Sequence, residues 1–151
     1  MAQPSSAEGV LRGPHKLEYT YRRSLGPVLG RFFNDLMKGK LVGIRSKTGK
    51  VIVPPQEYDP ETGETLDEFV EVGPAGEIVS WTWVTKPRTK QPFDHPFAYA
   101  LIRLDGADTP MLHAVDAGSE DKLAKGTRVV ARFAAKPVGS ICDLTHFELE
   151  G

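Results

Sequence analysis

The stretch that decides the fold is residues 41–55, which read LVGIRSKTGKVIVPP. Apolar residues fill both ends of this stretch, and a polar run with a glycine, residues 46–49, separates them. Two short apolar runs on either side of such a turn predict a β-hairpin. We therefore expect strands at 41–45 and 50–54.

The sequence beyond this hairpin predicts a chain that is mainly β. Glycine, proline and aspartate punctuation, as at 73–76, 105–106 and 116–118, divides it into short runs. The expected strands are Leu66–Val72, Glu77–Thr85, Phe97–Leu104, Met111–Val115, Thr127–Ala134 and Ile141–Phe147. A single helical turn is expected at 119–123. Five or six antiparallel strands with a helical insert predict a small closed barrel of the OB-fold type.

Upstream of the hairpin, the apolar residues recur at the spacing of one face of an amphipathic helix. The three-and-four spacing is carried by Leu25, Val28, Leu29, Phe32, Phe33, Leu36 and Met37. Ser24 is suited to cap the start and Gly39 to end the helix, while Gly30 would admit a close neighbour. This stripe has two interpretations. It covers one end of the barrel, or its residues from Leu25 to Leu36 form an exposed interface for a protein partner.

Composition and charge narrow the class of protein. The chain has 151 residues, a formal net charge of −1 and one cysteine. The charge gives no general attraction to nucleic acid or anionic lipid, and one cysteine excludes an internal disulfide. The polar start lacks the apolar core of a signal peptide, and no run is long enough to span a membrane. We expect a cytoplasmic protein.

The same patterns predict four regions. Residues 1–16 are expected to be a flexible leader, and 17–40 an N-terminal arm followed by the helix. Within the arm, Leu17–Tyr21 alternates apolar and polar residues, which permits a short strand or an extended segment. Residues 41–65 form the turn-rich hairpin region, and 66–151 the barrel.

The order of these motifs resembles one known family. Besides 43–55, the informative segments are YDPETG at 58–63, VEV at 70–72 with GEIVSWT at 76–82, PFAYALI at 96–102 and GTRVV at 126–130. Together they resemble the domain-of-unknown-function 35 (DUF35) family of acyl-CoA-associated proteins. That resemblance implies a helix, a rubredoxin-like zinc ribbon and an OB-fold, and it covers about residues 25–148.

The chain departs from this family at the metal site. The four cysteine positions of the family pattern fall on Ser46, Thr48 (or Gly49), Asp59 and Thr62. Zinc needs about four nitrogen, sulfur or carboxylate donors in a tetrahedral array, and neutral hydroxyls are poor ligands. We therefore predict that 41–65 is a metal-free remnant of a zinc ribbon, and that the protein holds no metal.

Residues capable of catalysis do not form a recognisable pattern. His95, His113 and His146 lie on or beside different predicted strands, so we interpret them as structural, with His95 suited to orient the loop before it. Cys142 is expected in the last strand as a buried apolar group. The acidic run from Asp59 to Glu71 is interpreted as a solvated face. We predict no catalytic residues.

One strand and its following loop suggest a ligand site. Trp81 and Trp83 are expected on the same face of a strand, followed by the basic loop that carries Lys86, Arg88 and Lys90. Aromatic rings beside cations would stack an adenine and pair with phosphates, as coenzyme A requires, or would stack single-stranded bases. The alternative is that one tryptophan is core and the loop only solvated.

The resemblance implies a non-catalytic accessory subunit. Its partner would be a thiolase-like or lipid-transfer-protein-type enzyme, a thiolase or retro-aldolase, with which it would share an acyl-CoA without binding a cofactor tightly. Residues 21–27 (YRRSLGP) and 104–110 (LDGADTP) are similar to family members associated with steroid side-chain degradation. The alternatives are an OB-fold that binds single-stranded nucleic acid, which the charge disfavours, and an independent acyl-CoA enzyme, which the missing nucleophile–base pair disfavours.

Overall fold

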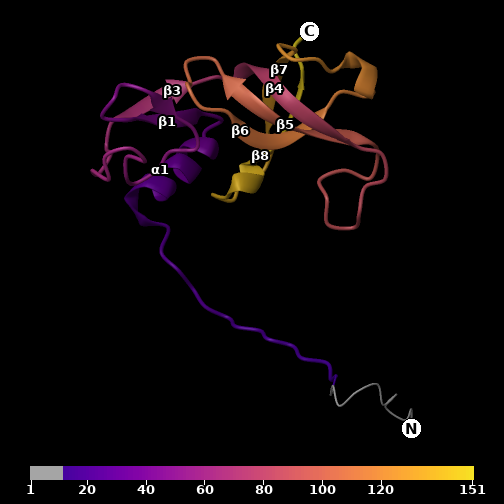
Figure 1. The fold of residues 1–151 in the computed structure, drawn as a ribbon, viewed down its shortest axis with the longest axis horizontal. Coiled ribbons are helices and arrows are strands. Elements are labelled where there is room, and N and C mark those ends of the chain that lie inside the picture. Colours follow the sequence, from indigo (N-terminus) through magenta and orange to yellow (C-terminus); the bar gives the residue numbers. More distant parts are fainter. Residues whose placement is uncertain (1–11) are drawn as a thin grey trace.

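The computed structural model describes residues 12–151, in which one helix precedes two β-sheets (Figure 1). The first lobe contains α1 (Gly26–Leu36), β1 (Leu41–Arg45), β2 (Val51–Ile52) and β3 (Phe69–Val72). The second contains β4 (Ala75–Val84), β5 (Phe97–Leu104), β6 (Met111–Asp116), η1 (Glu120–Lys122), β7 (Arg128–Phe133), η2 (Ile141–Asp143) and β8 (Leu144–Leu149). Residues 12–24 extend away from both lobes, and the part of the predicted leader at 1–11 lies outside the described residues.

The predicted helix forms, with two local differences. The Ser24 hydroxyl accepts a long 3.4 Å hydrogen bond from the Gly26 amide, but Leu25 occupies the N-cap position and gives no side-chain cap. Gly39 follows the helix with a φ of +70°, where glycine is favoured. A Cβ on Gly30 would meet no heavy atom within 4 Å. The expectation of a close neighbour at Gly30 is therefore wrong, because this helix face opens onto solvent.

The hairpin at 41–55 becomes part of a three-stranded sheet in the order β2-β1-β3. β3, which we expected in the barrel, instead pairs with β1 through partners such as Ile44 and Phe69. β2 is only two residues long, and along its outer edge the amides of Val51 and Val53 bond the side chains of Asp108 and Thr109. The sheet is thus joined to the barrel by the turn before β6.

A closed five-stranded barrel forms the second lobe, in the order β4-β5-β6-β8-β7. All neighbouring pairs are antiparallel except β6 and β8, which run parallel and pair Val115 with Phe147. The all-antiparallel expectation is corrected here, because the chain crosses over through η1, β7 and η2 before β8 closes the barrel. This topology confirms the predicted OB-fold.

The last strand begins later than predicted. Residues 141–143 form the short helical turn η2, in which the Cys142 amide bonds the Ser140 hydroxyl and Asp143 completes a capping box. β8 follows only at Leu144. A serine followed three residues later by an acidic residue is itself a signal for the start of a helical turn. The prediction of a strand at 141–147 followed the apolar residues and missed this signal.

The core is continuous across both lobes. One cluster of buried side chains includes Phe32 and Leu36 of α1, Leu41 of β1, and barrel residues such as Ile102 and Phe147. A smaller cluster, made of Val28, Ile44, Ile52 and Leu66, lies under the three-stranded sheet. Most buried apolar side chains of the first lobe therefore belong to the core that this lobe shares with the barrel. No helix in the described range is long and apolar enough to cross a membrane.

Candidate functional site

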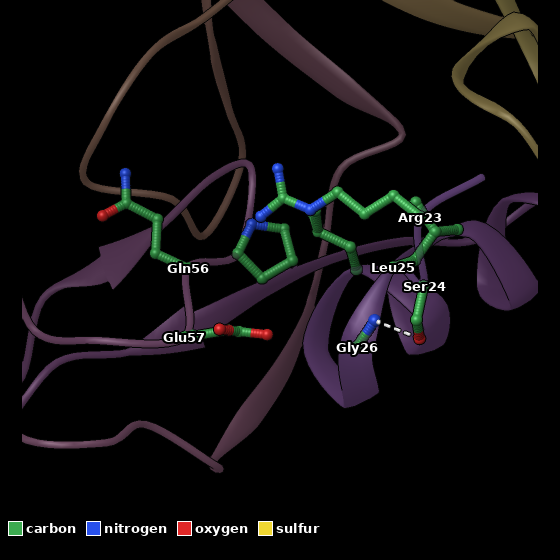
Figure 2. Close-up of a pocket in the computed structure, with 8 residues that line it drawn as sticks. Arg23, Ser24, Leu25, Gly26, Gln56 and Glu57 are labelled. Carbon is green, nitrogen blue, oxygen red and sulfur yellow. Dashed lines mark hydrogen bonds between the residues drawn. The ribbon is translucent and has the colours of Figure 1, made fainter. Parts of the chain in front are cut away.

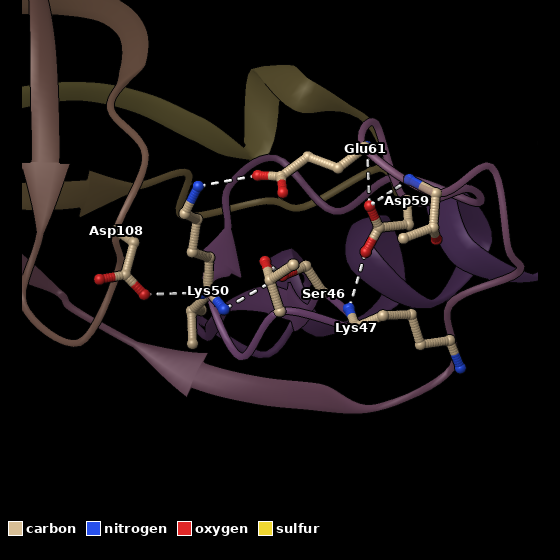
Figure 3. A network of polar contacts seen from close by, with 9 residues as sticks. Ser46, Lys47, Lys50, Asp59, Glu61 and Asp108 are labelled. Carbon is tan, nitrogen blue, oxygen red and sulfur yellow. Dashed lines mark hydrogen bonds and ion pairs between the residues drawn. The ribbon is translucent and has the colours of Figure 1, made fainter.

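The two turns that contain the predicted lost-ligand positions are joined by a hydrogen bond between the Lys47 amide and Asp59 (Figure 3). Asp59 is 2% exposed, and one of its carboxylate oxygens accepts a 2.7 Å hydrogen bond from the Lys47 amide of the first turn. The other oxygen accepts from the amides of Glu61 and Thr62, at 2.8 and 3.1 Å. The Lys47 hydrogen bond, helped by these two, holds the pKa of Asp59 below its ordinary value, although burial opposes it.

The first turn is closed by its own hydroxyls. Ser46 and Thr48 bond each other at 2.9 Å, and the Lys50 amide donates to the Ser46 hydroxyl at 3.1 Å. The Lys50 ammonium lies 2.8 Å from the Glu61 carboxylate, which raises the pKa of the lysine through this hydrogen bond and its charge. The polar side chains of the two turns therefore find their hydrogen-bond and ion-pair partners within the turns themselves.

These residues do not fit a zinc ion. Both oxygens of Asp59 already accept amide hydrogens, and the remaining positions offer neutral hydroxyls. No group of three or more His, Cys, Asp or Glu side chains lies close enough for a metal anywhere in residues 12–151. The interpretation of this region as a zinc-ribbon remnant stays a prediction, whereas the pairing of its two turns by Asp59 is observed.

The helix stripe is divided between core and surface. Val28, Phe32 and Leu36 are 5%, 1% and 1% exposed and pack inside this chain, and Phe33 is half-buried against the same core. These four side chains therefore pack mainly within the protein and are not available to a partner. Leu25 and Leu29 remain 47% and 36% exposed. Of the predicted interface, only these two leucines are free to meet a partner.

A cavity of about 590 Å³ lies beside these leucines, between the start of α1 and the segment after β2 (Figure 2). Its lining is Arg23, Ser24, Leu25, Gly26, Leu29, Pro55, Gln56 and Glu57. Gly26 has a φ of +74°, and a Cβ there would lie 2.5 Å from the Glu57 carboxylate. The cavity combines apolar side chains with one cation and one anion, the mixture typical of a protein-binding surface.

The two tryptophans differ in exposure. In β4, Trp81 pairs with Ala100 and Trp83 with Ala98, both buried residues of β5, so both rings are on the inner side of the strand. Trp83 is half-buried against the core, whereas Trp81 is 37% exposed, in the part of β4 that pairs with β5 and not with β7. Lys86, Arg88 and Lys90 are exposed in the following loop, where the Arg88 amide bonds the Gln91 side chain. Binding of coenzyme A here stays a prediction.

His95 connects this loop to the barrel. Its Nε2 lies 3.2 Å from the Asp116 carboxylate of β6, and its Nδ1 lies 3.4 Å from Asp94. Its ring contacts Phe93, which in turn packs against His146. His146 also hydrogen-bonds Glu148, whose pKa is lowered chiefly by Arg132. These contacts agree with structural roles for both histidines.

His113 and Cys142 line one shallow groove of about 410 Å³, a proximity that their separation in sequence concealed. Cys142 is exposed in η2, so the expectation of a buried strand residue is wrong. The Nδ1 atom of His113 is buried without a hydrogen-bond partner, and burial lowers the pKa of the ring. No hydrogen bond joins this cysteine to a histidine within residues 12–151, so the groove contains no formed nucleophile–base pair.

A helix, an open three-stranded sheet and a closed five-stranded barrel define a small OB-fold protein with an N-terminal lobe. Residues 69–134, from β3 through β7, match the family model described as "ChsH2, C-terminal OB-fold domain". Over these residues the chain therefore carries an OB-fold domain similar to the C-terminal domain of ChsH2. No curated protein matches it by sequence.

Two solved structures share the fold. One is a DUF35-family protein of unknown function from Sulfolobus solfataricus, with 20% identity and a TM-score of 0.62 over 83% of this chain and 87% of that one. The other belongs to an Ltp2-ChsH2(DUF35) aldolase, with 21% identity and a TM-score of 0.61 over 85% of this chain and 98% of that one. Both alignments cover more than the barrel.

Proposed function

We propose that this chain is a non-catalytic, cytoplasmic accessory subunit that docks onto a lipid-transfer-protein-type enzyme, a thiolase or retro-aldolase. In this role it helps to bind or channel an acyl-CoA, in steroid side-chain or fatty acyl-CoA degradation. The observation that carries the proposal is the fold likeness to a chain of the Ltp2-ChsH2(DUF35) aldolase, together with the family match at 69–134.

The arrangement of side chains supports a binding role. Within the described residues, 12–151, Cys142 and the histidines make no hydrogen-bonded pair with each other, and the acidic groups near the histidines serve in structural contacts. The exposed apolar residues Leu25 and Leu29, beside the cavity of Figure 2, are suited to bury surface against another protein. Catalytic groups would therefore come from the partner.

The acyl-CoA part of the proposal rests on Trp81 and the basic loop. Trp81 is exposed enough to stack on an adenine ring, and Lys86, Arg88 and Lys90 lie in the loop that follows its strand. Three cations in one exposed loop are suited to the phosphates of coenzyme A. The acyl chain would extend into the partner, where the chemistry takes place.

Docking is tested with the lipid-transfer-protein-type enzymes of the source organism, each purified and examined in turn. The two full-length proteins are mixed, and the mass of the complex is measured by size exclusion with light scattering. We expect a stable complex that L25S/L29S weakens and that L101S/L112S, two exposed leucines of the barrel, leaves unchanged. Absence of a complex with the wild-type chain would contradict the proposed function.

Ligand binding is tested by quenching of tryptophan fluorescence with octanoyl-CoA, measured on the complex. W81A and K86Q/R88Q/K90Q are expected to weaken binding, and K122Q, on the distant turn η1, is not. Tight binding of a deoxythymidine oligonucleotide by the isolated chain, with a steep dependence on salt, would instead favour the nucleic-acid alternative.

A further inference from the structure

The segment 12–24, called the arm from here on, is fully exposed and extends away from the body of the protein (Figure 1). Its residues form no helix or strand. Its polar contacts are local: Lys16 pairs with Glu18, and the Ser24 hydroxyl accepts from Gly26. The arm nevertheless carries three large apolar side chains, Leu17, Tyr19 and Tyr21, which are 67%, 76% and 80% exposed.

The order of residues in the arm fits an extended strand with two unlike faces. In an extended chain, successive side chains point to opposite sides. Leu17, Tyr19 and Tyr21 then share one side, while Lys16, Glu18, Thr20 and Arg22 share the other. An isolated strand has no partner for its amides and carbonyls, and peptides of this kind bind by adding to the edge of another sheet. The apolar side would enter pockets of the acceptor.

The formal net charge of the whole chain is −1, but positive and negative charges are separated along the sequence. The arm contains Arg12, Lys16, Arg22 and Arg23 against one acidic residue, a formal charge of +3. Residues 25–151 contain 15 basic and 18 acidic residues, a formal charge of −3. An acceptor for the arm is therefore expected to carry acidic side chains around its binding edge.

The arm continues directly into the surface already described beside α1. Arg23 lines the cavity in Figure 2, and the exposed leucines of the helix, Leu25 and Leu29, follow within one and two turns. Tyr58, which is 57% exposed, comes directly after the cavity residue Glu57. The exposed apolar residues of the arm therefore continue along the sequence into those at the start of the helix.

We propose that the arm is a docking strand that adds to an exposed sheet edge on the partner enzyme, at a site with acidic residues around apolar pockets. This inference rests on the proposed function and identifies the part of the chain that reaches the enzyme. Leu17, Tyr19 and Tyr21 fill the pockets, Arg22 and Arg23 pair with the acidic rim, and the helix start anchors the arm. Because Leu17, Tyr19 and Tyr21 bury little surface against the body of the protein, this part of the arm becomes ordered on the partner.

A protein acceptor fits better than a lipid bilayer. Glu18 lies in the middle of the arm and Glu57 lines the adjoining cavity, and the rest of the chain is negatively charged. An anionic membrane would repel all three. The cavity is also concave, which suits a protruding side chain and not a flat bilayer surface.

The decisive experiment measures the dissociation constant between the full-length chain and the lipid-transfer-protein-type enzyme that forms the complex, by biolayer interferometry. We expect L17S/Y19S/Y21S to weaken binding by roughly 100-fold, because buried aromatic anchors dominate interfaces. The control E18Q/T20S, on the opposite side of the same strand, is expected to stay within about threefold. The melting temperature of every arm variant should equal that of the wild type, since the substituted side chains are exposed.

Strand addition itself is tested by proline. In a strand, alternate residues direct their amides to opposite edges, so only one parity bonds the acceptor. We therefore expect one of T20P and Y19P, each compared with its alanine variant, to lose roughly tenfold more affinity, and the other to lose little. R22Q/R23Q should reduce the decrease in affinity between 50 and 500 mM NaCl.

The outcomes separate the two proposals. Wild-type affinity in the triple serine variant, with a complex still formed, overturns the docking strand and leaves the accessory role intact. Absence of any complex overturns both. Arm-dependent dimerisation of the chain alone, or arm-dependent binding to phosphatidylserine vesicles, also overturns the docking strand, because each identifies a different acceptor.

Discussion

Two buried aspartates show how the two lobes differ. Asp59 in the first lobe and Asp143 beside β8 are 2% and 1% exposed, and each accepts three backbone amides. The donors to Asp143 lie within five residues of it in sequence. One donor to Asp59 is Lys47, which is 12 residues away in another turn. The same chemistry closes a local loop in the barrel and joins two separate turns in the first lobe.

The difference follows from how each lobe satisfies its backbone. The barrel closes on itself, so every strand has a partner on both sides. The three-stranded sheet has two edges, and one of them is bonded by side chains of Asp108 and Thr109. The first lobe therefore relies on the shared core and a small number of polar contacts, of which Asp59 makes three.

The largest expected effect comes from breaking the core that the lobes share. Phe32 is 1% exposed and belongs to the cluster that includes barrel residues, so F32A should lower the free energy of unfolding by about 3–5 kcal/mol. Calorimetry should still show one transition, because both lobes lose the same contacts. M37A, at a 43% exposed position, is the control with little effect. Two resolved transitions would show that the lobes are independent.

A second comparison uses glycines that permit close approach in each lobe. A Cβ on Gly43 would lie 2.8 Å from the Ile52 carbonyl, and one on Gly76 would lie 2.6 Å from the Arg103 carbonyl. G43A and G76A should each lower the free energy of unfolding by about 1–3 kcal/mol. G30A should instead raise it by about 0.5–1 kcal/mol, because its Cβ meets nothing in a helix. Urea denaturation measures all three, and a neutral G43A would contradict the tight β1–β2 contact.

Local patterns predicted the elements well, and long-range pairing limited the rest. β1 and β5 begin and end where the sequence predicted, since each is bounded by turn residues. The assignment of β3 to the wrong sheet could not be avoided from its sequence, because the choice depends on pairing with β1, some 28 residues earlier. The same limit applies to sites. The burial of Phe32 and the meeting of Ser46, Thr48 and Asp59 required tertiary packing, whereas the alternation at 17–21 was visible in the sequence.

The role of Asp59 is sharpened by a matched pair of substitutions. D59N keeps the size but removes one strong acceptor, so we expect the Lys47 amide to lose its protection in hydrogen exchange. D143N should instead expose the amides of residues 138–140 and leave Lys47 protected. If D59N and D143N both removed the protection of the Lys47 amide, the two turns of the first lobe would open together with the loop beside β8, and the two sites would not be independent.

Acid provides a smaller effect on the same carboxylate. The pKa of Asp59 is lowered from its ordinary value of 3.8 by the Lys47 amide, so the charged form stabilises the folded state. This stabilisation is fully present when the pH is above the ordinary pKa, and it is lost as the pH falls through the lowered pKa of the folded state. The difference in melting temperature between wild type and D59N should therefore be constant from pH 7 to about 4 and shrink below it. A difference that grows on acidification would contradict this direction.

The smallest expected effect is that of zinc, and it tests whether hydrogen bonds have replaced a metal in the first lobe. The two turns are already joined by Asp59, whose oxygens both accept amides, and Ser46 and Thr48 bond each other. Zinc chloride or EDTA should therefore leave the melting temperature of the wild type unchanged, since only an ion that binds the folded state raises it. Metal analysis of protein produced in zinc-rich medium should find far less than one zinc per chain. A zinc-dependent rise in melting temperature that disappears in D59N would show that the carboxylate gives up its amides to a metal, and the two lobes would then differ by an ion and not by their backbone contacts.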